Sequence, residues 1–352
     1  MASKIEWTRN ADGTQGRTWE PVLGCSSVSS GCTNCYAERL TWRLANNPVC
    51  GKRYRGLVEM HYGRPYWTGE VRCDASVLEQ PLHWRKPTRI FVCSRSDLFH
   101  PKVPFSFIAE VFNVMFGEAS SSPQPKHTYL VLTKRAARMR EFFDWCSRGG
   151  DGTELAMMLQ ATLEAYGYFP RVWLGVTVEN QAATKRLDDL VATPAAMHFV
   201  SYELAVEAVD FRPYLGLRCE GCGAYGRTVE WCRIGTGYDN GHVDGDMPCG
   251  PMTKETPCVD WVIAGGESGP HSRPCDVAWI RSVVKQCQAA ETPVFVKQLG
   301  SNSVSSSDDD RRHCGDMTLP DGFRMIFRDR KGADPREWPE DLRIRQYPDV
   351  RR

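Results

Sequence analysis

The sequence lacks the features that mark several common classes of protein. It has no apolar run near the ~20 residues that a membrane span requires, and its polar start, MASKIEWTRN, has no signal-peptide core. A P-loop, an HExxH pair and a Ser/His/Asp signature are also missing. We therefore expect a cytoplasmic protein with no membrane partner.

The chain also lacks an excess of either charge. It has 44 basic and 43 acidic residues, which gives a formal net charge of +1. This balance provides no long-range attraction to nucleic acid, although a local basic groove remains compatible with it. Hydrophobic residues make up 41% of the 352 residues, enough for the core of one large barrel or of two domains.

Cysteine, in contrast, is abundant. Fifteen cysteines in a chain without a secretion signal favour metal binding and reduced thiols over a disulfide framework. Three of them, Cys25, Cys32 and Cys35, share one loop of small residues, and a helix-like run begins at Tyr36. Three thiolates from one loop can hold three irons of a 4Fe–4S cluster and leave the fourth iron open to a substrate. The alternative is a zinc site completed by Cys50 or a histidine.

The run from Gly24 to Arg39, GC…GCxNCYAER, resembles the cluster loop of radical S-adenosylmethionine (SAM) enzymes, including the spore photoproduct lyase-like group. Its first gap is three residues longer than the usual Cys-x3-Cys-x2-Cys. Most of residues 5–300 more narrowly resemble a phage- and prophage-associated radical SAM-like family of largely unknown function. The matching stretches are IEWT, TWEPVLGC, RIFVCSRSDLFH, VLTKRAARM, VWLGVTVENQ and WVIAGGESG.

This resemblance implies a specific cofactor arrangement. Cys25, Cys32 and Cys35 would hold the 4Fe–4S cluster, and SAM would bind its fourth iron through the methionine amino and carboxylate groups. Tyr36 would pack near the adenine. The partner would be an external one-electron reductant of the flavodoxin or ferredoxin type.

Short apolar strands alternate with amphipathic helices over most of the chain. Strands are expected at 18–24, 89–93, 128–132, 172–176, 197–201, 261–264 and 293–296, and helices at 105–116, 136–145, 154–166, 181–190 and 277–290. The pattern indicates a buried parallel sheet. About seven βα units favour an α/β fold with a TIM-like barrel, partial or complete, over a doubly wound sheet.

We divide the chain accordingly. Residues 1–300 form the barrel, with a Cys-rich insertion at 211–258, and residues 301–352 form a linker and a C-terminal tail. The stretch SNSVSSSDDD, at 301–310, is typical of a flexible linker. The tail is expected to pack on the surface and to cover the barrel mouth.

Polar residues follow nearly every expected strand, where barrel enzymes carry their chemistry. For any single one, a cap or a solvated turn is the alternative explanation. The candidates for cofactor binding are Tyr36, Ser94, Asp97, Glu179, Gly265, Gly266 and Glu267. The candidates for catalysis are Glu203, Lys297 and Cys93, the last as a radical relay at a strand end.

The sequence Gly265-Gly266-Glu267 combines two features of a ligand site. Glycines allow the backbone to approach a ligand closely, and a carboxylate accepts hydrogen bonds from an ammonium group. The resemblance associates such a GGE with the methionine amino group, but there it follows the second strand, where this chain has Ser94 and Asp97. The resemblance also places ribose contacts after the fourth strand, at Glu179.

The insertion carries a second cysteine pattern. Cys219 and Cys222 form a Cys-x2-Cys knuckle, which Cys232 and Cys249 could complete as a tetrahedral zinc site. About 40 Gly-rich residues bury too little apolar surface to stay ordered alone, and a structural zinc would supply that order. A second iron–sulfur cluster and unligated thiols are the alternatives.

The sequence is compatible with two candidate functions from different classes. The first is a radical SAM enzyme of isomerase or lyase type, acting on a DNA base, a hypermodified thymidine or another nucleotide; a small metabolite or a peptide remains open as substrate. The second is a non-catalytic, metal-stabilised nucleic-acid-binding protein. In that case the basic and aromatic loops Lys52 to Tyr66 and Lys134 to Arg140 would contact phosphates.

Overall fold

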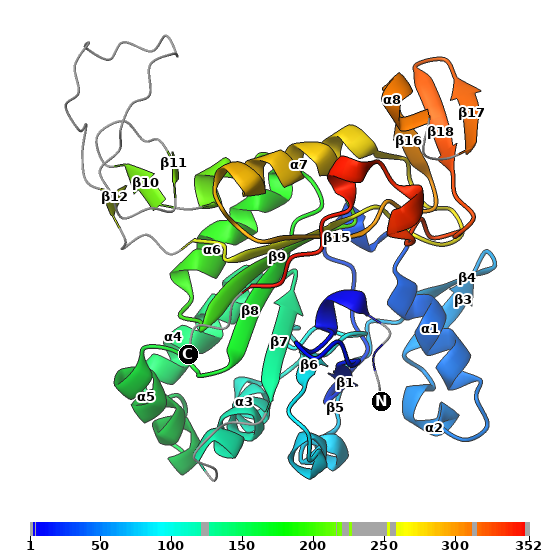
Figure 1. Cartoon of the computed structure of the whole chain (residues 1–352). Coiled ribbons are helices and arrows are strands. Elements are labelled where there is room, and N and C mark those ends of the chain that lie inside the picture. The colour runs from blue at the N-terminus through cyan, green and yellow to red at the C-terminus, as the bar shows by residue number, and fades with distance from the viewer. Residues whose placement is uncertain are drawn as a thin grey trace, which may run out of the picture.

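A seven-stranded parallel sheet forms the centre of the computed structural model, which describes residues 3, 5–120, 127–215, 217–219, 225–226, 252–253, 258–311 and 315–348 (Figure 1). Its strands, in spatial order, are β1 (Arg17–Trp19), β6 (Arg89–Val92), β7 (Thr128–Thr133), β8 (Val172–Thr177), β9 (Met197–Glu203), β13 (Trp261–Gly265) and β15 (Val294–Gln298). Every neighbouring pair is parallel. The spatial order follows the chain order, as in a barrel whose strands are added one after another.

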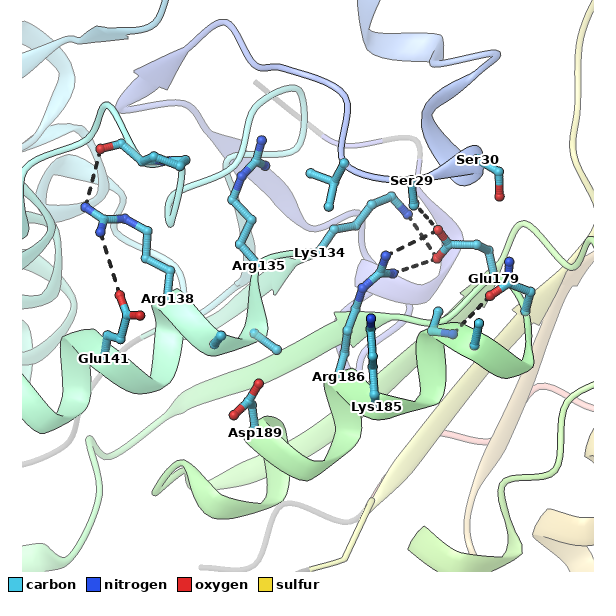
Figure 2. A pocket seen from close by; sticks show the side chains of 17 residues that line it. Ser29, Ser30, Lys134, Arg135, Arg138, Glu141, Glu179, Lys185, Arg186 and Asp189 are labelled. Carbon is cyan, nitrogen blue, oxygen red and sulfur yellow. Dashed lines mark hydrogen bonds and ion pairs between the residues drawn. The ribbon is translucent and has the colours of Figure 1, made fainter.

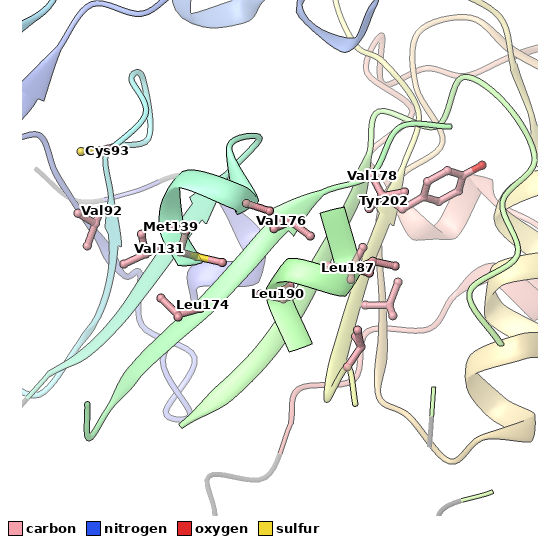
Figure 3. Close-up of a cluster of buried hydrophobic side chains, with 14 of the residues drawn as sticks. Val92, Cys93, Val131, Met139, Leu174, Val176, Val178, Leu187, Leu190 and Tyr202 are labelled. Carbon is pink, nitrogen blue, oxygen red and sulfur yellow. The ribbon is translucent and has the colours of Figure 1, made fainter. Parts of the chain in front are cut away.

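Helices alternate with these strands, as the sequence predicts. They are α1 (Tyr36–Ala45), α2 (Gly51–Tyr54), α3 (Phe105–Ser120), α4 (Ala136–Ser147), α5 (Glu154–Tyr166), α6 (Arg186–Ala192), α7 (Val277–Ala289) and α8 (Asp308–Arg311). Figure 3 shows part of the main core, where Val131 and Leu174 of the sheet pack with Met139 of α4 and Leu187 of α6. The sheet curls without closing, and β1 and β15 are its two edges within the described residues. The partial form of the predicted barrel is therefore the one that the described residues support.

Aromatic side chains fill the opposite face of the sheet. Because side chains alternate along a strand, Phe91, Trp173 and Trp261 leave the helix-covered core and form a second buried cluster. Trp7 lies in a short N-terminal turn, Glu6–Thr8, and its ring centroid is 4.8 Å from that of Phe91. These aromatic side chains thus pack the interior of the curled sheet.

The C-terminal tail covers an edge of the sheet. The N–H of Val296 donates to the carbonyl oxygen of Ile344 at 2.8 Å, and the N–H of Gln346 donates to that of Val294 at 3.0 Å. Trp338 is fully buried beside this segment. Pairing with the tail protects the backbone groups of β15 that an open edge would expose.

The predicted flexible linker at 301–310 is wrong. Residues Ser303–Ser305 form β16, which lies in a small sheet with β14 (Cys275–Asp276), β18 (Gly322–Ile326) and β17 (Gly315–Leu319). The hydroxyl of Ser305 donates to Asp310 at 2.6 Å, and Asp310 pairs with Arg281 of α7 at 2.8 Å. Buried polar partners therefore order a serine-rich stretch that composition alone describes as a linker.

The predicted first strand is divided in two. After β1, Pro21 has no N–H to continue a ladder, and β2 (Val22–Leu23) pairs instead with β5 (Arg72–Cys73). A hairpin, β3 (Val58–His61) and β4 (Arg64–Trp67), lies between α2 and β5 in the chain. The chain leaves the main sheet at β2 and enters the cysteine loop directly.

The Cys-rich insertion is described only in short pieces. Strands β10 (Leu217–Cys219), β11 (Tyr225–Gly226) and β12 (Met252–Thr253) form a three-stranded sheet. Cys222, Cys232 and Cys249 lie outside the described residues, as does the side chain of Cys219, so the zinc site stays a prediction. Among the helices that the structure describes, none is both long and apolar enough to cross a membrane.

Candidate functional site

The predicted cluster loop connects β2 to α1. It begins at Gly24, where φ is +85° and an added Cβ would stand 2.1 Å from the carbonyl oxygen of Glu70, so only glycine fits. A short 3-10 turn, Ser30–Cys32, follows, and the N–H of Cys35 donates to the carbonyl oxygen of Cys32 at 3.2 Å. The thiols of Cys25, Cys32 and Cys35 are all free and half-buried.

Side chains from the carboxyl ends of four strands hold this loop. Asp97 follows β6, Arg135 follows β7, Glu179 follows β8 and Glu267 follows β13. Each of them contacts the loop directly or through a neighbouring side chain. The structure therefore brings together residues that are far apart in the chain, at the edge of the sheet where the sequence predicts the site.

Asp97 anchors the first part of the loop through Arg135. Its buried carboxylate accepts a hydrogen bond from Thr133 at 2.8 Å and pairs with Arg135 at 2.8 Å. Arg135 in turn donates to the carbonyl oxygen of Ser26 at 2.9 Å and lies 3.9 Å from the sulfur of Cys25. Asp97, predicted as a cofactor contact, is thus placed as a support for Arg135.

His100 is a buried member of the site that the sequence analysis missed. Its Nδ1 accepts from the N–H of Lys102 at 3.1 Å, so its Nε2 carries the proton and faces the hydroxyl of Ser26 at 2.8 Å. Burial, together with Arg135, lowers the pKa of His100 to about 4. The ring is therefore neutral at pH 7, and both of its nitrogens are engaged.

Glu179 is the most buried anchor. Its carboxylate accepts hydrogen bonds from Ser29 of the loop and from Arg186 at 2.7 Å, and it pairs with Lys134 at 3.6 Å (Figure 2). Burial alone would raise the pKa of Glu179, but Lys134, Arg186 and Ser29 outweigh it and lower the pKa to about 2. Glu179 is therefore a permanent anion that joins the loop to two cations.

Glu267 holds the end of the loop. Its buried carboxylate accepts from the N–H of Arg273 at 2.8 Å, from the guanidinium of Arg273 at 3.0 Å and from Asn34 at 3.3 Å. Arg273 also reaches the carbonyl oxygen of Ser30 at 2.8 Å. The predicted acceptor for an ammonium group is thus already paired with a guanidinium within the protein.

The two glycines before Glu267 are required by protein packing. A Cβ on Gly266 would stand 2.0 Å from the carbonyl oxygen of Leu299, and one on Gly265 would stand 3.0 Å from that of Gln298. Gln298 also donates to the carbonyl oxygen of Gly266 at 2.9 Å. The close backbone approach predicted for a ligand is made here by the last residue of β15 and the residue after it.

Tyr36 and Ser94 connect the start of α1 to the end of β6. The hydroxyl of Tyr36 donates to the carbonyl oxygen of Ser94, and the hydroxyl of Ser94 donates to the buried carboxylate of Glu20. The residue Tyr36 is nevertheless 52% exposed. Cys93, the predicted relay, is buried in the core between sheet and helices, and this burial raises the pKa of its thiol.

Glu203 and Lys297, the two remaining catalytic candidates, form an ion pair. Glu203 is the last residue of β9. In the pairing of β13 with β15, Ala264 lies opposite Val296 and Gly265 opposite Gln298, so Lys297 is left as an extra, bulged residue. Such a bulge redirects a side chain. Both side chains remain partly accessible, at 19% and 18%.

The three thiols lie near cations, but in their present positions they do not group as the ligands of one metal site within the described residues. Arg135 lies 3.9 Å from the sulfur of Cys25, and Lys134 interacts electrostatically with Cys32 and Cys35. Burial raises the pKa of Cys25 to about 12 and also raises that of Cys35. Within the described part of the chain, no three His, Cys, Asp or Glu residues are grouped so that they could hold a metal ion.

Comparison with known proteins identifies the family of the chain. A family model described as "Protein of unknown function (DUF5131)" matches residues 2–339, so the chain belongs to this family. No curated protein and no solved structure matches the chain.

Proposed function

We propose that this member of the DUF5131 family is a radical SAM enzyme in which Cys25, Cys32 and Cys35 hold a 4Fe–4S cluster. The observation that carries the proposal is the position of the cysteine loop. It follows the first two strands, at the carboxyl edge of a curled parallel sheet, and anchors from β6, β7, β8 and β13 hold it there. That edge is where barrel folds carry out chemistry.

The donor chemistry of the loop fits such a cluster. Three free thiols lie within one short loop, and the adjacent cations Lys134 and Arg135 would balance the negative charge of three thiolates. Ligation requires the three sulfurs to converge from their present positions. When bound, the cluster and SAM together supply one-electron cleavage of a C–S bond and a 5′-deoxyadenosyl radical that takes a hydrogen atom from the substrate.

The zinc alternative is weaker because two candidates for its fourth ligand, Cys50 and His100, are engaged elsewhere in the described structure. Cys50 lies beyond the far end of α1, whose 10 residues span about 15 Å, and it packs in a small core with Leu44 and Tyr54. The other candidate nearby, His100, uses both ring nitrogens within the protein.

The remaining site residues have defined tasks in this proposal. Glu203 and Lys297 offer a partly accessible carboxylate and ammonium for proton transfer or for binding a polar substrate. The exposed ring of Tyr36 offers a surface for the adenine, next to Cys35.

Anaerobic reconstitution tests the proposal. The protein should take up about four irons per chain and, with a flavodoxin- or ferredoxin-type reductant, should release 5′-deoxyadenosine from SAM. A variant with Cys25, Cys32 and Cys35 all replaced by Ala should do neither, whereas Cys73→Ala, at an exposed thiol outside the loop, should do both. SAM cleavage by the triple variant, or zinc without iron in the wild type, would refute the assignment.

The substrate proposed is a DNA base, a hypermodified thymidine or another nucleotide. Nucleosides from cells with and without the active protein should differ by mass spectrometry. A profile that stays unchanged while SAM is cleaved would remove nucleic acid from the proposal and leave the radical SAM assignment intact.

A further inference from the structure

A groove beside the cysteine loop has no ligand assigned to it in the function proposed above, although Lys134 and Arg135 are part of its lining. It is a cavity of about 820 Å³ between the N-terminal parts of α4 and α6, and Ser29 and Ser30 of the loop form one wall (Figure 2). The size is that of a small-molecule site. None of the residues that line it is a proposed cluster ligand.

Cations outnumber carboxylates around this groove. The cations are Lys134, Arg135, Arg138, Lys185 and Arg186, and the carboxylates are Glu141, Glu179 and Asp189. The whole chain has a formal net charge of only +1, so this excess is a local property. A cleft lined by one sign of charge concentrates its field and attracts ligands of the opposite sign.

The carboxylates do not cancel this charge, although Asp97, outside the lining, pairs with Arg135 at 2.8 Å. Glu179 is shared by Lys134 and Arg186 at the same time. Asp189 lies 3.5 Å from Arg140, a further cation outside the lining. Glu141 is 3.9 Å from Arg138.

Lys185 is the cation best placed to receive a ligand. It is exposed, and within the described part of the chain it forms no ion pair. In Figure 2 its side chain rises beside Arg186 towards the wall formed by Ser29. It can therefore bind an anion without first giving up a partner.

We propose that this groove binds a phosphate group, carried by a nucleotide or by a nucleic-acid strand. Lysine and arginine form strong charge-assisted hydrogen bonds with phosphate oxygens. The first turn of α4, at Ala136 and Ala137, lines the same groove and adds the positive end of a helix. A ligand held there would lie next to the cysteine loop, and only its nearness to a cluster rests on the proposed function.

The test measures binding to the full chain at low salt, with and without iron, by fluorescence anisotropy of a labelled single-stranded oligonucleotide. Lys185→Glu should weaken binding about tenfold or more, and Lys185→Ala should weaken it less, because reversal adds repulsion to the lost attraction. Lys285→Glu is the matched control, since Lys285 is an exposed lysine on α7. It should change the affinity by less than about twofold.

Competition separates the two sources of phosphate. Displacement by a nucleoside 5′-monophosphate or by inorganic phosphate assigns a site for one phosphate. If only an unlabelled strand displaces the probe, and the affinity falls steeply with salt, the groove binds the phosphate backbone of a nucleic acid. Equal weakening by the Lys185 and Lys285 reversals, or no binding of any of these probes, would overturn the proposal. Neither result affects the test of SAM cleavage.

Discussion

Gly31 of the cysteine loop lies directly against the buried carboxylate of Glu179. A Cβ built on Gly31 would stand 2.7 Å from Oε1 and 2.8 Å from Cδ of Glu179. Arg186 and Lys134 also hold this carboxylate, so it has little freedom to move away. The contact fixes how closely the loop approaches the carboxyl end of β8.

Replacing Gly31 by Ala should therefore disturb the loop. We expect a loss of about 1–3 kcal/mol in the free energy of unfolding, the usual cost of an added methyl group in a packed site. Denaturant titration of the metal-free protein measures this loss. Gly315→Ala is the control, because there the new Cβ would meet its nearest neighbour, in Ile326, at an ordinary 3.5 Å. Equal stability of the two variants would mean that the Gly31–Glu179 contact is not tight.

The Glu179 carboxylate should stabilise the fold in a pH-dependent way. Its folded-state pKa of about 2 lies below the unfolded value of about 4.3. The stabilisation is thus complete above the unfolded value and is lost as the pH falls towards about 2. The difference between these pKa values corresponds to about 3 kcal/mol at pH 7.

Glu179→Gln tests this expectation. Urea titrations should show the variant about 3 kcal/mol less stable at pH 7, with the gap to the wild type narrowing below about pH 4.3. Glu141→Gln, at a side chain that is 63% exposed, should stay within about 0.5 kcal/mol of the wild type. A gap for Glu179→Gln that is constant down to pH 3 would contradict a depressed pKa.

Arg135 should not be replaceable by lysine. Its guanidinium binds Asp97 and Ser26 together, and a single ammonium cannot reproduce that fork. Arg135→Lys should therefore cost about 1–3 kcal/mol of stability, because the buried Asp97 loses part of its pairing. Arg140→Lys, at a half-exposed arginine 3.5 Å from Asp189, should cost under about 1 kcal/mol. Thermal unfolding measures the loss of stability in both variants. A loss for Arg135→Lys no larger than that for Arg140→Lys would contradict the prediction.

The tail should contribute to the stability of the main fold. Trp338 is fully buried, and its indole N–H donates to the carbonyl oxygen of Gly332 at 2.9 Å. Trp338→Ala should therefore lose about 3–5 kcal/mol. Tyr62→Ala removes another large aromatic side chain, but from a fully exposed hairpin turn, and should change stability by under about 0.5 kcal/mol. Similar unfolding midpoints for both variants would show that the tail packs independently of the sheet.

Most of the α/β alternation could be predicted from the sequence because it depends on local patterns. Val172–Thr177 is a continuous buried strand, and α5 covers Glu154–Tyr166 as its periodicity indicates. Local patterns failed where a partner from elsewhere in the chain decides the structure. Ser303–Ser305 appeared to lie in a linker because the partners of β16 in β14 and β18 could not be recognised, and the strand at 18–24 divided because β2 pairs with β5.

The sequence by itself determined the three thiols of one loop and the polar residues at the strand ends, because motif spacing and strand periodicity are local. Only the tertiary structure decided what those residues touch. Glu267 and Asp97 are engaged by Arg273 and Arg135, and Gly266 is pressed against Leu299. Arg186, Arg273 and His100 had no sequence signal of their own. Their roles arise because parallel strands bring distant residues to one edge, where buried charges must find partners.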